Sequence, residues 1–341
     1  METLLLYLPF LVPVAAANLA ERHRRSRYVT HDPRLNTLID VGLRYMPYGL
    51  LITINVGLLG IAALVLVNEL AKMLIPDLVD AQAVAVNWWG VAAACLLTSI
   101  LAFLPLFPAA RRGLARWLPI DPDSPVHTTA LAFAVYQIGL SLGQIALIGN
   151  LETLTDAELA LSIWDVLLTG VPLALFALVG VGLFIRRDGR STLERLGLRR
   201  PTWKQLAAAV GITAALLAFD FCTNLVWEGV APASYDLMER VTENLFGNLA
   251  TVGGAIVLGL SAGISEELLF RGAVQPRLGL LLASVLFAIG HMQYGLTVAT
   301  LEVFIIGLML GLIRKRSSTT LCIVIHASFN AAGVLLGMLW P

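Results

Sequence analysis

Apolar runs long enough to cross a membrane recur along nearly the whole of this 341-residue chain. An α-helix rises 1.5 Å per residue, so about 20 residues are needed to span roughly 30 Å of hydrocarbon. Hydrophobic residues make up 58% of the chain and charged residues only 13%, a balance outside that of soluble domains. The sequence therefore predicts an all-α polytopic membrane protein.

The apolar runs predict about ten transmembrane helices. Their expected limits are residues 3–19, 43–67, 86–108, 129–149, 163–185, 205–223, 246–275, 278–292, 295–313 and 319–339. The first run is expected to be retained and not cleaved as a signal, because its arginines follow the apolar residues instead of preceding them.

The predicted loops alternate in charge. Those after the first, third, fifth and ninth helices are basic, and the loops after the second, fourth and sixth are acidic. The positive-inside rule then assigns the basic loops to the cytoplasm and both termini to the outside. The net formal charge of zero gives no indication of nucleic-acid binding.

The fifth loop, residues 186–204, is also the candidate domain boundary. It holds seven basic residues: Arg186, Arg187, Arg190, Arg195, Arg199, Arg200 and Lys204. Residues 1–200 form an amino-terminal set of helices whose role is open. Residues 201–341 contain every candidate catalytic group.

The segment SEELLFRG places Glu266, Glu267 and Arg271 inside or at the edge of a predicted span. A charge near the bilayer centre costs roughly 2.5–3.5 kcal/mol, so such residues are candidates for function. Residues four apart share a helix face, so Glu267 can pair with Arg271 while Glu266 points elsewhere as a candidate general base. In the alternative interpretation, both glutamates lie in water at the helix end and have no catalytic role.

Two later segments carry further polar groups at helical spacing. His291 lies four residues after Phe287, and Asn330 lies four residues after His326. A neutral imidazole beside a carboxylate can activate water, and a His and an Asn on one stripe can donate hydrogen bonds to an oxyanion. Packing of His291 and interhelical hydrogen bonding by the other two are the structural alternatives.

The three segments SEELLFRG, FAIGH and HASFN, in this order and each in its own apolar run, resemble the CPBP family. This family is also called ABI, and it includes the CAAX-type intramembrane proteases, which are metal-independent glutamate proteases. Its motifs EExxxR, FxxxH and HxxxN/D are all present within residues 205–341. The resemblance implies that Glu266 and His291 activate water, that Glu267 and Arg271 support them, and that His326 and Asn330 stabilise the oxyanion.

The resemblance implies an integral membrane endopeptidase of a bacterial or archaeal plasma membrane, with its active site toward the cytoplasm. Its partners would be membrane lipid and a peptide or lipidated protein substrate, with no nucleic acid and no cofactor. The sequence does not indicate the physiological substrate or the oligomeric state.

Several other patterns compete with this interpretation. GLSAG at 259–263 matches G-x-S-x-G, but that motif needs a strand before its turn, and Gly259 and Gly263 instead predict a helix-packing face. Cys322 with His326 and Asn330 could suggest a cysteine protease, although all three share one helix. Zinc held by Glu266, His291 and His326 is a further alternative.

Two non-enzymatic functions stay open. Asp220, Asn224 and Glu302 could join the buried Glu and His residues in a transport path, which would make the protein a transporter or channel. A non-catalytic bacteriocin-immunity protein is the other alternative, because some members of the family are associated with immunity.

Simple topology raises one geometric difficulty. Glu266 would lie toward the cytoplasmic end of its helix, and His291 toward the outer end of the next. The two could meet if the first helix continues to about Gln275, where Pro276 would stop it, and if 278–292 crosses only part of the membrane.

Overall fold

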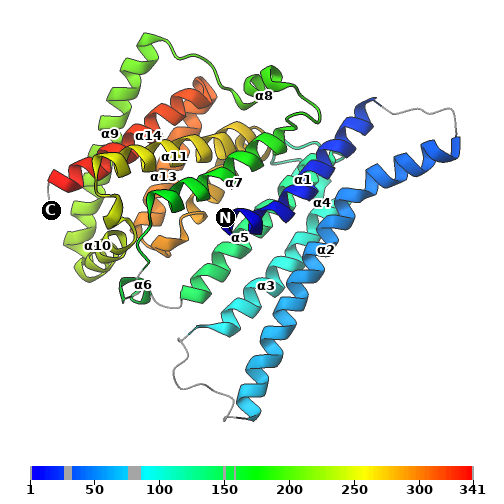
Figure 1. The fold of residues 1–341 in the computed structure, drawn as a ribbon, viewed down its shortest axis with the longest axis horizontal. Coiled ribbons are helices and arrows are strands. Elements are labelled where there is room, and N and C mark those ends of the chain that lie inside the picture. Colours follow the sequence, from blue (N-terminus) through cyan, green and yellow to red (C-terminus); the bar gives the residue numbers. More distant parts are fainter. Residues whose placement is uncertain (1, 27–32, 76–85, 149–150, 157–158, 340–341) are drawn as a thin grey trace.

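The structure is a computed structural model that describes residues 2–26, 33–75, 86–148, 151–156 and 159–339 (Figure 1). The described chain is a bundle of α-helices without strands, as the composition predicts. The longer helices are α1 (Glu2–Ser26), α2 (Pro33–Leu74), α3 (Trp88–Phe103), α5 (Pro125–Ile148), α7 (Ile163–Val181), α9 (Trp203–Val230), α11 (Val252–Glu267), α12 (Gln275–Ile289), α13 (Val298–Arg316) and α14 (Thr319–Leu339). The remaining α-helices are α4 (Pro108–Leu114), α6 (Thr153–Asp156), α8 (Gly189–Leu196) and α10 (Pro232–Phe246).

Each of the ten predicted segments overlaps one of the longer helices, but the limits differ. Within the described residues, seven helical stretches are long and apolar enough to cross a membrane. One of these seven, Val252–Ile289, includes both α11 and α12. The predicted helix 43–67 is too short, because α2 extends over 42 residues into polar sequence at both ends. The predicted helix 163–185 is too long, because α7 ends before Gly182, whose φ of 92° is a left-handed conformation that suits glycine.

The predicted helix 246–275 begins too early. Residues Pro232–Phe246 form α10, which is separate, and the following helix starts at Val252. Thr251 sets this start because its side chain accepts a hydrogen bond from the Gly254 backbone N–H. Such an N-cap satisfies a donor that the helix itself cannot pair.

The chain reverses at Gly279, within α12, so the expectation that Pro276 stops the helix is wrong. A π-helical segment, Leu268–Val274, follows α11, and Pro276 is accommodated in the first turn of α12, where a missing N–H is tolerated. Gly279 has φ 83° and ψ 170°, and the chain turns back there. The rest of α12 then runs back along the π-helical segment, and this return brings His291 to the depth of Glu266.

Helix α11 packs against α14 through two glycines. A Cβ atom on Gly259 would lie 2.5 Å from the backbone oxygen of Ala327, and one on Gly263 would lie 2.9 Å from the Ala327 backbone nitrogen. Only a residue without a side chain permits this approach. The predicted packing face of small residues is therefore confirmed, and it determines how closely α11 and α14 can place their polar groups.

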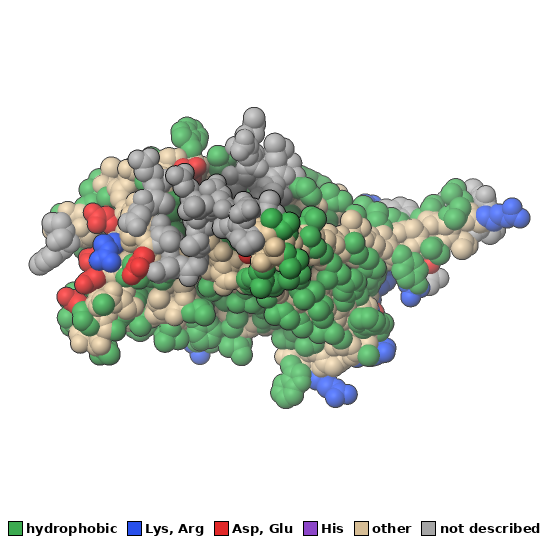
Figure 2. Space-filling model, turned by 90° about the horizontal axis from the view of Figure 1, so that it is seen from below, with side chains coloured by type: hydrophobic (Ala, Val, Ile, Leu, Met, Phe, Trp, Pro, Cys, Tyr) green, Lys and Arg blue, Asp and Glu red, His purple; other side chains and the backbone are tan. Residues whose placement is uncertain are grey.

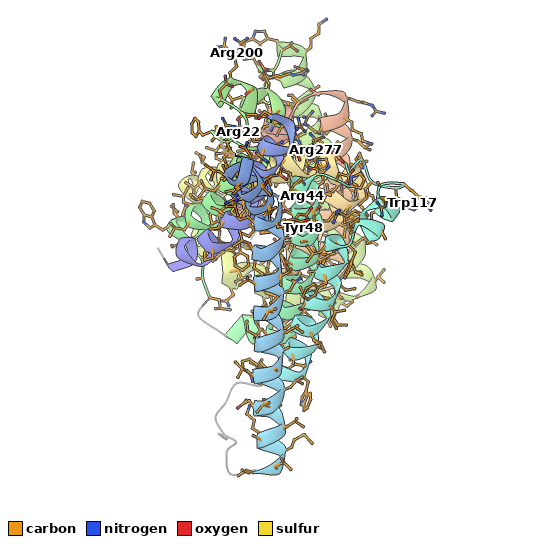
Figure 3. All side chains as sticks on the ribbon, turned by 90° about the vertical axis from the view of Figure 1, so that its right-hand side faces the viewer. Arg22, Arg44, Tyr48, Trp117, Arg200 and Arg277 are labelled. Carbon is orange, nitrogen blue, oxygen red and sulfur yellow. The ribbon has the colours of Figure 1, made fainter. Side chains whose placement is uncertain are left out.

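The basic loops meet at one end of the bundle. Three hydrogen bonds join them: Arg24 to the Asp121 carboxylate at 2.6 Å, Arg22 to the Ile185 carbonyl at 3.1 Å, and the Arg199 backbone N–H to the Thr320 hydroxyl at 3.0 Å. Figure 3 shows Arg22, Arg200 and Arg277 toward this end. Figure 2 shows a largely apolar face, with Asp and Glu side chains gathered toward one end of it. The surface thus has the apolar belt and charge asymmetry of a membrane protein.

Candidate active site

Glu267 and Arg271 form a buried ion pair across one turn at the end of α11. Arg271 Nε lies 3.2 Å from Glu267 Oε2, and the exposed fractions of the two side chains are 1% and 0%. The guanidinium also contacts the carbonyl of Gly307 at 3.3 Å and lies over the Phe287 ring, 4.2 Å from its centre. Arg271 is therefore enclosed by α13 and α12 and has no path to solvent for catalysis.

His326 reaches the same carboxylate from α14. Its Nδ1 lies 3.0 Å from Oε1 of Glu267, and its side chain is 6% exposed. Because Nδ1 is occupied by Glu267, Nε2 is the ring nitrogen left for a reacting group. Glu267 therefore links Arg271 and His326, and it orients both.

Glu266 points away from this network and faces His291 instead. Glu266 Oε2 lies 3.7 Å from His291 Nε2, and the two side chains are 16% and 19% exposed. No hydrogen bond reaches Oε2 of Glu266 from the residues that the structure describes. The adjacent glutamates thus occupy different environments, Glu267 fully buried and Glu266 partly exposed.

The orientation of His291 is fixed by its own helix. His291 Nδ1 lies 2.9 Å from the carbonyl oxygen of Phe287. A carbonyl only accepts hydrogen bonds, so Nδ1 carries the proton and Nε2 presents its lone pair to Glu266 in the neutral ring. Two hydrogen-bond acceptors therefore face one another, and a group with two donors could bridge them.

Phe287 is the residue that sequence reasoning did not recognise as part of the site. Its ring packs against His291 at 5.0 Å, His326 at 5.8 Å and Phe270 at 5.4 Å between ring centres. In FAIGH, Phe287 precedes His291 by four residues and so shares its helix face. This spacing was the one sequence feature that indicated a place for Phe287 near the site. The Tyr294 ring also stacks with His291, 6.3 Å between ring centres, and nothing in the sequence distinguished it.

Asn330 is the predicted site residue with the weakest contact to the others. It lies one turn after His326 on α14 and is half-buried. Within the described part of the chain, no hydrogen bond joins it to the other five predicted residues. The structure therefore brings together Glu266 with His291, and Glu267 with Arg271 and His326, while Asn330 lies beside them.

The competing patterns have other roles in the fold. The hydroxyl of Ser261, from GLSAG, donates to the Val166 carbonyl at 2.9 Å and so ties α11 to α7. Cys322 is fully buried, and its thiol contacts the Leu310 carbonyl at 3.3 Å. In the described ranges no group of three or more His, Cys, Asp or Glu side chains is arranged to hold a metal ion.

The residues suggested for a transport path form a separate contact. Asp220 on α9 interacts with Glu302 on α13 and with Asn224. Glu302 is buried, and its Oε1 receives no hydrogen bond from the described chain. This carboxyl pair is distinct from the Glu266–His291 pair.

Comparison with known proteins gives a match to the part of the chain that contains the predicted site residues. Residues 248–332 match the family model described as type II CAAX prenyl endopeptidase Rce1-like. This segment is therefore similar to the Rce1-like family. All six predicted site residues lie within the Rce1-like segment, which supports a protease of the CAAX-type intramembrane kind.

A relative of the chain is an uncharacterised protein, YpbD, of Bacillus subtilis. The two are 30% identical over 126 residues, which is 36% of this chain and 61% of the relative. No solved structure matches the chain. The division between residues 1–200 and 201–341 stays a prediction, although α7, from the first part, packs against α11.

Proposed function

We propose that this protein is an intramembrane endopeptidase that hydrolyses peptide bonds with water activated by Glu266 and His291. The Glu266–His291 contact is the observation that carries the proposal. Its two acceptor atoms are 3.7 Å apart, which is too long for a direct hydrogen bond but suits two groups that share one water molecule. A water donates two O–H groups, so it can satisfy both acceptors and keep a lone pair for attack.

The reaction proceeds by direct attack on the peptide carbonyl. The water oxygen bonds to the carbonyl carbon, and the proton that the water loses passes to Glu266. His291 orients the water by accepting a hydrogen bond from it. The tetrahedral intermediate then breaks its C–N bond, and the proton on Glu266 passes to the leaving amine. No covalent enzyme intermediate is needed.

Stabilisation of the oxyanion is assigned to His326 and Asn330. Nδ1 of His326 donates to the Glu267 carboxylate, so Nε2 donates to the oxyanion when the ring is protonated, and the Asn330 amide lies one turn away on the same helix. Removal of one oxyanion donor lowers kcat by about 10²–10³-fold in well-studied hydrolases. Arg271 and Glu267 are positioning residues, because neither reaches accessible space.

The substrate that we propose is a peptide segment held at or in the membrane, such as the end of a lipidated protein. Glu266 and His291 are partly exposed within a bundle whose outer surface is apolar, so a substrate already bound to lipid reaches them without crossing a polar surface. We place the cytoplasm at the basic end of the bundle, by the positive-inside rule. No metal ion or other cofactor is required for this mechanism.

The decisive experiment is cleavage of a library of membrane-anchored peptides by the purified, reconstituted protein. We expect specific cleavage that is lost in Glu266→Gln and in His291→Ala, while both variants insert and fold normally. Glu239→Gln is the matched control, because Glu239 is exposed on α10 and distant in sequence from the motifs. Cleavage by Glu266→Gln at the wild-type rate would remove the assignment of the base.

The same preparations test the non-enzymatic alternative. A transporter or channel that uses Asp220 and Glu302 would give ion or solute flux into vesicles without peptide cleavage, and Asp220→Asn would abolish the flux. Flux that depends on Asp220, together with no cleavage of any peptide, would replace the peptidase proposal.

A further inference from the structure

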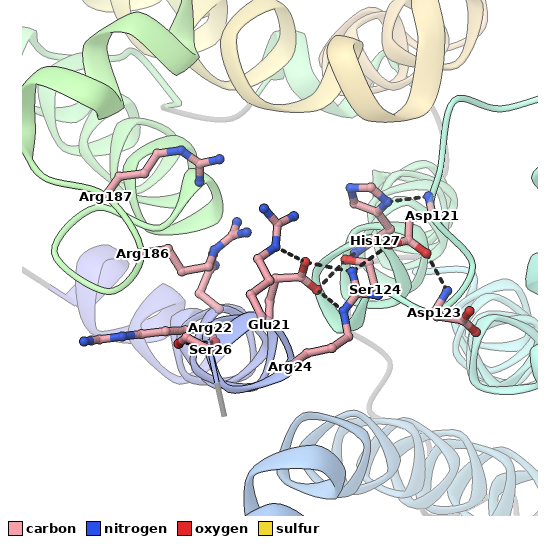
Figure 4. Close-up of polar contacts among 12 residues, drawn as sticks. Glu21, Arg22, Arg24, Ser26, Asp121, Asp123, Ser124, His127, Arg186 and Arg187 are labelled. Carbon is pink, nitrogen blue, oxygen red and sulfur yellow. Dashed lines mark hydrogen bonds and ion pairs between the residues drawn. The ribbon is translucent and has the colours of Figure 1, made fainter. Parts of the chain in front are cut away.

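An arginine-lined pocket lies at the basic end of the bundle, outside the candidate active site. Arg22 and Arg25 line it from the end of α1, and Arg186 and Arg187 line it from the loop after α7. Its cavity is about 640 Å³ and open to the surface. Figure 4 shows the end of α1 beside the loop that carries Arg186 and Arg187.

The pocket wall on the side of the α7–α8 loop is held in shape by neutral groups. Asn18 of α1 donates to the Val179 carbonyl at 2.9 Å and accepts from Arg186 Nε at 2.7 Å. Arg187 donates to the carbonyl of Val181. Arg186 and Arg187 are therefore held by neutral oxygen atoms, which position their cations without cancelling them.

Acidic groups near the pocket are already engaged. Glu21 pairs with Arg25 at 2.8 Å and with Arg24 at 2.9 Å. The Asp188 carboxylate caps α8 by accepting the Ser191 backbone N–H at 2.8 Å. The lining consequently carries an excess of positive charge within one pocket.

Burial and neighbouring cations both act on the two arginines of this loop. Burial lowers the pKa of Arg186 to about 10, and the neighbouring charge of Arg187 adds to the shift. Burial also lowers the pKa of Arg187, with repulsion from Arg277 and Arg25 contributing. A bound anion would relieve both the desolvation and the repulsion.

The turn that forms the pocket also projects an aromatic side chain. Phe184 is 83% exposed and has φ 57°, a left-handed conformation that is unfavourable for a residue with a side chain. Hydrogen bonds from the Phe184 N–H to the Arg187 carbonyl and from the Arg186 N–H to the Gly182 carbonyl, both 2.8 Å, hold this turn. An exposed ring beside arginines at the end of an apolar helix fits the headgroup level of a bilayer.

We propose that this pocket binds the phosphate headgroup of an anionic phospholipid. Arg25, Arg186 and Arg187 would contact the phosphate oxygens, and Phe184 would insert among the acyl chains nearby. Arg–phosphate contacts are charge-assisted and directional, so the site discriminates the headgroup by charge. The bound lipid would bridge α1 and the α7–α8 loop. The site is independent of the proposed cleavage reaction.

The test is titration of the purified protein with phosphatidylglycerol or phosphatidylcholine, with bound lipid counted by native mass spectrometry. We expect the wild type to bind phosphatidylglycerol about tenfold or more tightly than phosphatidylcholine, because both carry a phosphate but the choline ammonium offsets its charge and is repelled by the arginines. The double variant Arg186→Gln with Arg187→Gln should lose this preference. Arg190→Gln is the matched control, because Arg190 lies in the same basic segment with its side chain 90% exposed.

Two further measurements distinguish a lipid from a free anion and from general attraction. Phe184→Ser alters only an exposed side chain, and it should weaken lipid binding severalfold without changing thermal stability. Inorganic phosphate should bind far more weakly than the lipid. If Arg190→Gln lost the preference for phosphatidylglycerol as fully as the double variant, the attraction would be a diffuse property of the surface and the proposal would be overturned. Equal affinity for inorganic phosphate and lipid would also overturn it.

Discussion

Nδ1 of His326 lies 3.0 Å from Oε1 of Glu267, so a contact closed to solvent joins α14 to the end of α11. Arg271 approaches the other oxygen of the same carboxylate at 3.2 Å. The pair Glu266 and His291 lies beside this network and is partly exposed. Adjacent glutamates in one motif thus differ in surroundings because a helix directs them about 100° apart.

Loss of Arg271 should destabilise the protein as well as inactivate it. Arg271→Ala leaves the buried Glu267 carboxylate without its cation, and removal of one partner of a buried pair costs about 3–5 kcal/mol. Thermal unfolding in detergent measures this loss. Arg271→Met combined with Glu267→Gln should recover part of the stability, because no unpaired charge is left, and an equally unstable double variant would contradict the explanation.

The close approach of α11 and α14 should tolerate no side chain at Gly259. Gly259→Ala places a Cβ atom 2.5 Å from the Ala327 carbonyl oxygen, and such overpacking costs about 1–3 kcal/mol. A Cβ atom on Gly253, in the same helix, would meet no neighbouring atom within 4 Å, so Gly253→Ala should be neutral or slightly stabilising. Comparison of the two unfolding midpoints tests the packing, and similar midpoints would argue against it.

Cleavage should not depend on the thiol of Cys322. The thiol is fully buried and contacts the Leu310 carbonyl, so it does not reach the space between Glu266 and His291. Cys322→Ala should therefore keep the wild-type rate within about twofold, a difference below about 0.5 kcal/mol in activation free energy. A cysteine protease would instead lose activity by orders of magnitude in the same assay.

Cleavage should also survive removal of metal ions. The proposed base and its histidine partner activate water by hydrogen bonding, and His326 is bound to Glu267. Prolonged dialysis against a chelator, with metal content measured by mass spectrometry, should leave the rate unchanged. Loss of activity that added zinc restores would favour the alternative in which Glu266, His291 and His326 are ligands.

The sequence was informative where one helix alone decides the outcome. The spacing of Glu267 and Arg271 predicted their ion pair, and the spacing of Gly259 and Gly263 predicted a packing face, because four residues return a side chain to the same side of a helix. It was less informative at boundaries. Helix ends depended on local capping, as at Thr251 and Gly182, and on polar residues that continue a helix beyond the apolar run.

By itself, then, the sequence determined the class of fold and the approximate positions of its apolar helices. It also determined which polar residues lie within these helices, where their cost makes them candidates for function. Only the tertiary structure decided which of those residues meet. The reversal at Gly279 brings His291 back to Glu266, and the contact between α11 and α14 brings His326 to Glu267. The physical reason is that helical periodicity fixes directions within one helix, whereas contacts between helices depend on chain reversal and on how closely two backbones can pack.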